Sequence, residues 1–506
     1  MLSQPTVGQV LVNDIRKDRS HPFLDGRPKR LLIGGEWVGS ISGKTFTSID
    51  PSTGAPLAEV FEGGSADIDR AVACARRAFE GPWSGFKPYE RQRVLLKLAD
   101  LVEQHYDELA RLESLDYGGA ISRTMSRRRR HVSLLSYYAA LAVSIQGETI
   151  ENSIPGEYFS YTLKQPIGVV GGIYAWNAPL DMMIWKIAPT LATGCTIVVK
   201  PATEAALTTL RFAELLIEAG VPEGVVNIVP GGVEAGTTLV NHPGVDKITF
   251  TGSTATGQAI VRASAGNLKR LSLELGGKSP DIVFDDADLD AAVPGSAMGV
   301  FANAGQSCAA GTRVFVQQGI YEEFVERVAS YGKALKVGDA LDPKADIGPV
   351  ISQRQLDRVL GYMQKGKTEG ARLVLGGGRA DVEARPGGYF VEPTVFADVD
   401  DEMTIAREEI FGPVMSVLPF RDVDEVVRRS NQSEYGLAGG IWTRDVSKVH
   451  HVARKLCAGS IWVNCYTQLD PAVPFGGFKS SGYGRESGSR HLDSFLEIKS
   501  VTIKVG

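Results

Sequence analysis

From residue 167 onward, short runs of apolar residues alternate with stretches of helical periodicity, and this alternation constrains the fold more than any other feature. A strand that is apolar at consecutive positions must be buried on both faces, as in a parallel sheet covered by helices. The sequence therefore predicts an α/β protein. The strand-like runs are IGVVGGIYA (167–175), CTIVVK (195–200), VVNIVP (225–230), KITFTG (247–252) and LSLEL (271–275).

Helical periodicity separates these runs and also precedes them. Residues 203–220 and 253–266 lie between the runs, and residues 65–81 and 88–118 come before them. In each segment the apolar residues recur every three or four positions, which is typical of a helix packed on one side. In sheets of this kind ligands bind beyond the carboxyl ends of the strands, near helix N-termini.

A second alternation begins near residue 280 and predicts a second α/β domain. It contains DIVF, TRVFVQ, VMSVLPF, AGGIWT and GSIWVN as strands, with helices over 287–306 and 320–336. The late segment 493–505 has strand character and is expected to pair with another element or another subunit. Residues 1–30 are polar and without pattern, so we expect them to be loosely attached.

Bulk properties exclude several classes of protein. A length of 506 residues suits about three domains of about 150 residues each. The net charge of −5 is small and argues against a nucleic-acid partner, and no apolar run is long enough to cross a membrane. Five cysteines without zinc spacing argue against a metal site and favour free thiols in a reducing compartment. We therefore expect a cytoplasmic protein.

One cysteine, Cys308, lies among small neutral residues in FANAGQSCAAGT (301–312). It is either a packed core thiol or a nucleophile, and the local sequence favours packing because no neighbour could activate it. The dinucleotide fingerprint G-x-G-x-x-G is missing. FTGSTATG (250–257) opens a helix after a strand. This segment is either a binding site for a phosphate group or an ordinary turn between a strand and a helix. Lys200 ends a strand where ligands bind, or simply extends into solvent.

Seven segments together resemble the aldehyde dehydrogenase superfamily, in its NAD(P)-dependent, hydrolytic branch, over about residues 30–506. They are YAWNAP (174–179), VVKPAT (198–203), FTGST (250–254), LELGGKSP (273–280), FANAGQSCAAGT (301–312), EEIFGPV (408–414) and PFGGFKSSGYGRE (474–486). The resemblance implies a Rossmann-like NAD(P)-binding domain (31–144 and 166–275) and a catalytic domain (276–489). It also implies a bridging β-arm (145–165 and 490–506) that joins subunits into a homodimer or homotetramer.

The resemblance also implies roles for individual residues. Cys308 matches the nucleophile that attacks the aldehyde, Asn177 the oxyanion-hole amide and Glu274 the general base. A carboxyl group between an apolar strand and glycines should have a raised pKa, as a base near neutral pH requires. Cofactor contacts are implied at Ile173, Trp176, Lys200, Thr203, Gly232, Gly252, Ser253, Glu409 and Phe411.

The sequence departs from the family pattern in places that bear on specificity. Thr203 stands where NAD-specific members carry a glutamate, which permits NADP use, although NAD stays slightly favoured. The implied substrate pocket is apolar and wide, which favours a bulky hydrophobic aldehyde, aromatic or terpenoid-like. Asp181 is unusual there; it either favours a cationic aldehyde or faces solvent, and solvent is the favoured interpretation. The pocket residues are Ala178, Met182, Trp185, Ser307, Ala309, Leu469 and Phe475.

Two alternatives to a hydrolytic enzyme stay open. One is a CoA-acylating relative, in which CoA cleaves the thioester; the presence of Glu274 argues against it. The other is a catalytically silent binding protein on the same fold. The run RRRR (127–130) is interpreted as a solvated helix face or a subunit-interface ion-pair network.

Overall fold

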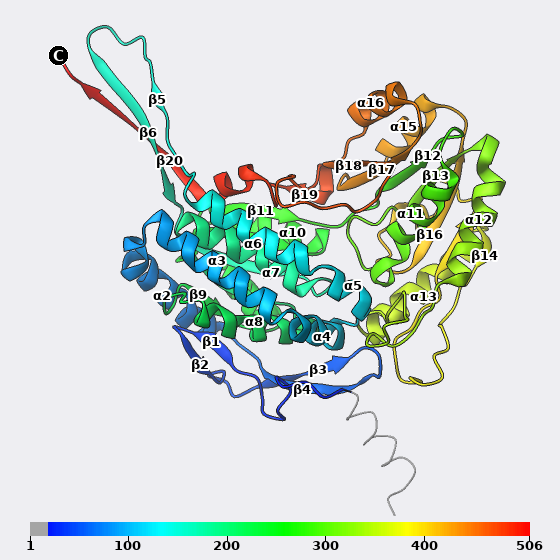
Figure 1. The fold of residues 1–506 in the computed structure, drawn as a ribbon, viewed down its shortest axis with the longest axis horizontal. Helices are drawn as coiled ribbons and strands as arrows, with labels where there is room; N and C mark the ends of the chain where they lie inside the picture. Colours follow the sequence, from blue (N-terminus) through cyan, green and yellow to red (C-terminus); the bar gives the residue numbers. More distant parts are fainter. Residues whose placement is uncertain (1–18) are drawn as a thin grey trace, which may run out of the picture.

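Two largely parallel sheets, each flanked by helices, form the body of the computed structural model, which describes residues 19–506 (Figure 1). The five strands from β11 to β9 pair in parallel, and the three outer strands of the larger sheet join it by antiparallel pairing. In spatial order the larger sheet contains β19 (Gly482–Tyr483), β11 (Arg270–Glu274), β10 (Lys247–Thr251), β7 (Val169–Tyr174), β8 (Thr196–Lys200), β9 (Val226–Ile228), β1 (Leu31–Ile33) and β2 (Glu36–Val38).

Helices bury both faces of this sheet. In β7, Val170 packs in one hydrophobic cluster with α3, α4, α6, α7 and α8, whereas its neighbour Val169 packs in another with α2, α9 and α10. Successive strand residues point to opposite faces, so a strand covered on both sides is apolar throughout. The predicted α/β class is confirmed. The helices are α2 (Ser65–Glu80), α3 (Pro88–Gln104), α4 (Tyr106–Tyr117), α5 (Ile121–Ser126), α6 (Arg128–Ala142), α7 (Pro179–Thr193), α8 (Leu207–Glu218), α9 (Val233–Asn241) and α10 (Thr254–Ser264).

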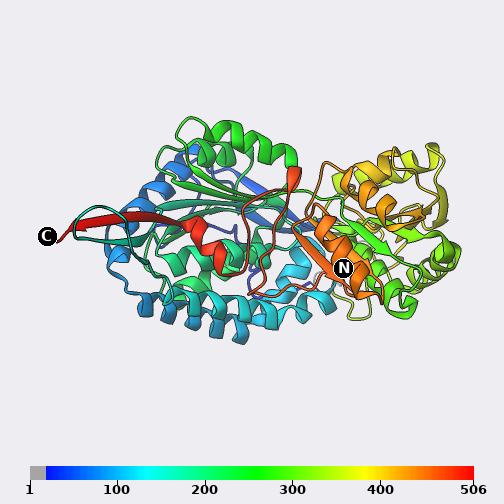
Figure 2. The ribbon, with the colours of Figure 1, turned by 90° about the horizontal axis from the view of Figure 1, so that it is seen from above.

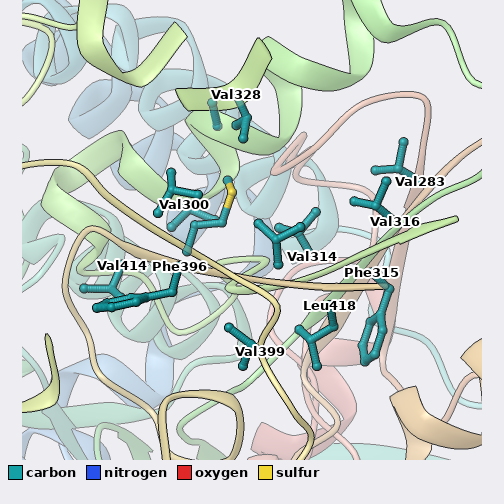
Figure 3. Packing of buried hydrophobic residues seen from close by; sticks show 14 of the residues in the cluster. Val283, Val300, Val314, Phe315, Val316, Val328, Phe396, Val399, Val414 and Leu418 are labelled. Atoms are coloured by element: carbon teal, nitrogen blue, oxygen red, sulfur yellow. The ribbon is translucent and has the colours of Figure 1, made fainter. Parts of the chain in front are cut away.

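The second sheet has seven strands, all paired in parallel except at the β14 edge. Its core is filled by branched and aromatic side chains such as Val314, Phe396 and Leu418 (Figure 3). The strands are β14 (Arg372–Leu375), β15 (Thr394–Ala397), β16 (Val414–Phe420), β13 (Arg313–Gln317), β12 (Pro280–Val283), β17 (Ala438–Trp442) and β18 (Ser460–Val463). The helices are α11 (Leu289–Phe301), α12 (Tyr321–Ala334), α13 (Gln353–Thr368), α14 (Thr404–Arg407), α15 (Val423–Asn431) and α16 (Val446–Lys455).

A long β-arm projects from the larger half of the molecule (Figures 1 and 2). Strand β20 (Leu496–Lys504) pairs antiparallel with β6 (Tyr158–Pro166) along its whole length, and the short β5 (Thr149–Ile150) pairs with the other edge of β6. A separate hairpin of β3 (Thr45–Asp50) and β4 (Ala55–Phe61) packs beside the helical layer.

The structure differs from the sequence-based expectations at three places in the fold, one of which is the helix expected over 287–306, whose α-helical part ends at Phe301. The helix expected over 88–118 is interrupted at His105, where ψ is 12°; the acidic first turn of α4 then favours a new helix start. Residues 1–30 were expected to be loosely attached, and the first 18 of them lie outside the described residues. From residue 19 this expectation is corrected: Arg19 is buried and pairs with Asp50 at 3.1 Å and with Asp339.

Two features are absent from residues 19–506. No helix in this part of the chain is long and apolar enough to span a membrane. Within the same residues, no group of three or more His, Cys, Asp or Glu side chains could hold a metal ion.

Candidate active site

Cys308 lies on a tight loop that follows α11, and the backbone of this loop is unusual. Asn303 and Ala304 have φ of 59° and 54°, in the left-handed region that side chains disfavour. Gly305 also has positive φ, and a Cβ there would lie 2.0 Å from the carbonyl carbon of Gly412. Glycine is therefore required at 305 for the loop to pack against the segment before β16.

Asn177 is fixed against this loop by amide hydrogen bonds. Its Nδ2 donates to the carbonyl of Gln306 at 2.9 Å, and Asn303 Nδ2 donates to the carbonyl of Asn177 at 3.0 Å. The hydroxyl of Tyr117 in turn donates to Asn303 Oδ1 at 3.1 Å. The Asn177 amide carries a second N–H, which this network leaves available to a ligand.

A cavity of about 440 Å³ brings the three expected catalytic residues together. Asn177 reaches it from the carboxyl end of β7, Glu274 from the end of β11 and Cys308 from its loop. The same cavity is lined by six other residues that the sequence singled out, namely Trp176, Met182, Gly252, Ser253, Glu409 and Phe411.

The carboxyl group of Glu274 is buried and has no hydrogen-bond partner on either oxygen among the described residues. Burial raises its pKa well above the usual range, and the nearby charge of Glu486 raises it further. Lys186 opposes this effect and forms a buried ion pair with Glu486, while donating to Thr251 Oγ1 at 2.6 Å. A carboxyl group of raised pKa and free oxygens is suited to accept a proton near neutral pH.

The thiol of Cys308 is held in its protonated form. Burial raises its pKa to about 12, with further contributions from the charges of Glu409 and Glu274. A thiolate is the reactive species, so attack by Cys308 requires removal of its proton. Glu274 lines the same cavity and is the candidate acceptor.

A second, larger cavity of about 870 Å³ adjoins the first, and the two share Trp176, Gly252 and Ser253 among their lining residues. It runs past two helix N-termini: Ser253 caps α10, and Gly232 precedes α9 without a side-chain cap. The expected cofactor residues that line it are Ile173, Trp176, Lys200, Thr203, Gly232, Gly252 and Ser253.

The remaining two expected cofactor residues, Glu409 and Phe411, line the smaller cavity and not the larger one. Glu409 Oε1 accepts the N–H of Gly277 at 3.0 Å, and burial raises the pKa of Glu409 to about 6. Phe411 meets the ring of Trp176 edge-on, with centroids 5.3 Å apart, and its carbonyl accepts Gln355 Nε2 at 2.8 Å.

Of the seven expected substrate-pocket residues, only Met182 lines either of these two cavities. Ser307 and Ala309 flank Cys308, and the buried rings of Trp185 and Phe475 are parallel, with centroids 6.3 Å apart. Met182 lines the smaller cavity. Ala178 packs on the helical side of the larger domain, and Leu469 packs on both hydrophobic cores.

Asp181 does not face solvent, and this expectation is corrected. Only 1% of Asp181 is exposed, because α6 packs against α7 and covers it. Its carboxylate binds Arg130, lies 3.2 Å from Arg127 Nη1 and lies 2.7 Å from His131 Nε2. These neighbours lower the pKa of Asp181 well below its usual range despite its burial.

The arginine run is likewise not simply a solvated face. Arg127 and Arg130 turn inward to Asp181, while Arg128 pairs with Asp107 and lies 3.6 Å from Glu103. The run therefore neutralises a buried carboxylate within the chain.

Sequence reasoning missed the contribution of α13. Arg354, Gln355 and Arg358 line the smaller cavity from this helix. None of them lies in a motif, so the sequence held no signal for them. Lys186 and Glu486 were also missed, although Glu486 ends the motif PFGGFKSSGYGRE.

Comparisons with known proteins give a consistent result. The sequence model described as the aldehyde dehydrogenase family matches residues 37–501. The putative aldehyde dehydrogenase DhaS of Bacillus subtilis is 50% identical over 490 residues, covering 96% of this chain and 98% of that protein. The human mitochondrial aldehyde dehydrogenase is 47% identical over 481 residues, covering 94% and 92%. The structure of an aldehyde dehydrogenase from Bacillus cereus in complex with NAD+ superimposes with a TM-score of 0.92 at 46% identity, and all of both chains is covered.

Proposed function

The chain belongs to the aldehyde dehydrogenase family, and from this premise we propose that it oxidises an aldehyde to the carboxylic acid through a covalent intermediate on Cys308, with NAD+ as electron acceptor. The observation that carries the proposal is the cavity that Cys308, Glu274 and Asn177 share. It lies next to a larger cavity of a size and lining that suit a dinucleotide.

The residues of the larger cavity fit NAD+. The N-terminus of α9 has no side-chain cap, so its free N–H groups suit a pyrophosphate. Lys200 is suited to the adenosine ribose, and Glu409 and Phe411 to the nicotinamide ribose. When bound, the nicotinamide accepts the hydride that leaves the substrate carbon. The NAD+ complex of the Bacillus cereus relative supports the use of NAD+ here.

The first half of the proposed reaction forms a thioester. Glu274 takes the proton of the Cys308 thiol, and the sulfur bonds to the aldehyde carbon to give a thiohemiacetal. The second N–H of the Asn177 amide and the backbone N–H of Cys308 stabilise the oxygen, which gains negative charge. Departure of hydride from that carbon leaves the thioester on Cys308.

The second half releases the acid. Glu274 first releases the thiol proton to solvent and then removes a proton from a water molecule, whose oxygen attacks the thioester carbon. Collapse of this adduct displaces the Cys308 sulfur as a thiolate, to which Glu274 returns the proton taken from water. The cavity is lined by the buried carboxyl group of Glu274, whose two oxygens have no hydrogen-bond partner within residues 19–506. Such a group can activate water, which supports hydrolysis of the thioester over transfer of the acyl group to CoA. The same intact set of residues argues against a catalytically silent binding protein.

We propose a bulky hydrophobic substrate, aromatic or terpenoid-like. The support is the stack of Trp185 on Phe475 together with the apolar side chains of Met182 and Leu469. A cationic aldehyde loses its support, because the carboxylate of Asp181 is already occupied by two arginines.

The β-arm is proposed to pair with a second copy of the chain, giving a homodimer or homotetramer. Apolar side chains on the arm are 41–66% exposed and would be covered by such pairing; they are Ile150, Ile154, Phe159, Leu163, Ile498 and Ile503. All five cysteines are free, which is in keeping with the reducing cytoplasmic location that we propose.

A panel of aldehydes assayed with NAD+ tests the proposal. Bulky apolar aldehydes should give the highest kcat/KM, and Cys308→Ala should abolish NADH formation with every one of them. A preference for short charged aldehydes would contradict the substrate class. Oxidation at the wild-type rate by the Cys308→Ala variant would contradict the mechanism.

A further inference from the structure

Two buried side chains in the last two turns of α4 reach the surroundings of Asn177. Glu113 and Tyr117 are four residues apart, so they lie on the same side of this helix. Glu113 Oε1 accepts the N–H of Leu180, in the first turn of α7, at 3.2 Å. The hydroxyl of Tyr117 donates to Asn303 Oδ1 at 3.1 Å. The helix therefore contacts both the chain that follows Asn177 and the loop that faces it.

The side-chain amide of Asn303 is engaged at both of its ends. Its Nδ2 donates to the carbonyl of Asn177 at 3.0 Å and to the carbonyl of Gln306 at 3.1 Å, and these two bonds use both of its N–H groups. Its Oδ1 accepts the hydroxyl of Tyr117. Asn303 is buried, so without that hydroxyl a buried oxygen would lose its partner, which is unfavourable.

The loop that Asn303 belongs to also sets the position of the Asn177 amide. The carbonyl of Gln306, which accepts Asn177 Nδ2 at 2.9 Å, lies two residues before Cys308 in this loop. Asn303 has φ of 59°, a left-handed conformation that is unfavourable for a residue with a side chain and needs support from its surroundings. The hydrogen bonds of the Asn303 amide provide that support.

The Tyr117 hydroxyl is a permanent donor in this network. Burial raises the pKa of Tyr117 to about 12, so the hydroxyl keeps its proton at neutral pH. Tyr117 lines neither of the two cavities described above. Its hydroxyl therefore influences the reaction only through the groups that it holds.

We propose that Tyr117 is a positioning residue for the oxyanion site: its hydroxyl holds Asn303, and Asn303 holds Asn177 so that the second amide N–H of Asn177 points to the substrate oxygen. The inference rests on the proposed function, which assigns that N–H to the oxygen of the thiohemiacetal. The oxyanion site is thus supported from α4, a helix that contributes no residue to the smaller cavity.

The variant Tyr117→Phe removes the hydroxyl and keeps the ring. Rapid mixing of enzyme, NAD+ and aldehyde should show that the first equivalent of NADH forms about threefold to tenfold more slowly. This effect is smaller than the loss of a whole oxyanion donor, about 10²–10³-fold, because the Asn177 amide is still present but less well oriented. The Kd of NAD+ should change less than about twofold. Slower NADH formation is the support that the proposal requires.

A double-mutant cycle separates positioning from a general structural effect. In the Asn177→Ala background, Tyr117→Phe should slow formation of the first NADH by less than about 1.5-fold further, because the amide through which the hydroxyl acts is gone. If Tyr117→Phe slows the reaction by the same factor in both backgrounds, the hydroxyl does not act through Asn177 and the proposal is wrong.

Tyr106→Phe is a matched control on the same helix. Tyr106 is fully buried, and its hydroxyl donates to the carbonyl of Thr124 at 2.9 Å, away from Asn177. This variant should alter the rate of NADH formation by less than about twofold. If it slows the reaction as much as Tyr117→Phe does, loss of any buried hydroxyl from α4 is sufficient and the proposal is wrong.

Two further outcomes would overturn the proposal. One is a Tyr117→Phe variant that forms the first NADH at the wild-type rate, and the other is a variant whose only defect is weaker binding of NAD+. Failure of the proposed function looks different. In that case Cys308→Ala or Asn177→Ala would form NADH at the wild-type rate, whatever the effect of Tyr117→Phe.

Discussion

Cys308 and Glu274 line one cavity, where burial raises the pKa of the thiol and the charges of Glu409 and Glu274 raise it further. A Cys308 thiolate beside a Glu274 carboxylate is therefore unfavourable, because both groups are negative. Transfer of the thiol proton to Glu274 leaves only one negative charge on the two groups. This relationship explains how a cysteine without titratable neighbours in sequence can serve as a nucleophile.

Replacing Glu274 with glutamine should slow turnover strongly. The amide cannot take a proton from the thiol or from water, and loss of a general base typically lowers kcat by about 10²–10⁴-fold. Steady-state kcat with a good aldehyde measures this effect, and unchanged binding of NAD+ shows that the fold is intact. A kcat within about threefold of wild type would remove Glu274 from the mechanism.

Replacing Glu486 with glutamine should extend activity to lower pH. The charge of Glu486 raises the pKa of Glu274, so its removal lowers that pKa and leaves the base ionised in more acidic solution. The acidic limb of the kcat/KM profile should therefore move to lower pH. Glutamine can still accept a hydrogen bond from Lys186, which limits structural damage. A limb that stays in place or moves to higher pH would show that another group controls it.

Replacing Asn177 with alanine tests the oxyanion site. Loss of one donor of this kind raises the barrier by about 2.7–4 kcal/mol, or about 10²–10³-fold in kcat. Rapid mixing of enzyme, NAD+ and aldehyde should show that formation of the first equivalent of NADH is slowed. Equal rates in wild type and variant would mean that the Asn177 amide acts only in packing.

Replacing Asp181 with asparagine should destabilise the fold. The variant leaves Arg127 and Arg130 without their buried partner, and breaking such a pair costs about 3–5 kcal/mol. Because the folded-state pKa of Asp181 lies below its unfolded value, its stabilisation is present above about pH 4 and is lost as the pH falls through the folded-state pKa. Urea unfolding at pH 7 measures the loss.

The matched control for Asp181 is Asp107→Asn. Asp107 pairs with Arg128 of the same arginine run but is 74% exposed, and surface pairs of this kind contribute about 0–1 kcal/mol. If the two variants have the same stability, Asp181 does not hold the buried charges together.

The sequence was sufficient for the α/β class because strands buried on both faces leave a continuous apolar pattern. The burial of Asp181 could not be predicted from the sequence. The helix that covers it, α6, starts about 50 residues earlier, and the residues around position 181 carry no pattern that indicates this packing. The break at His105 could not be predicted either, because one non-helical residue leaves the helical spacing of the apolar residues on both sides unchanged.

The candidate site also contains some residues that the sequence could indicate and others that only the structure shows. Cys308 alone resembled a packed thiol, and its role was inferred from the family resemblance rather than from its neighbours. Arg354 reaches the larger cavity from α13, a helix without any motif. Only the tertiary structure brings this arginine beside Glu204.

The central claim is that Cys308 carries the substrate as a thioester that Glu274 helps to hydrolyse. The most direct test is mass spectrometry of the Glu274→Gln variant after mixing with aldehyde and NAD+. We predict a mass increase equal to the acyl group on the peptide that contains Cys308, which develops slowly because the variant lacks the base for the thiol and persists because the variant also lacks the base for hydrolysis. Rapid NADH formation without any acyl group on that peptide would contradict the account.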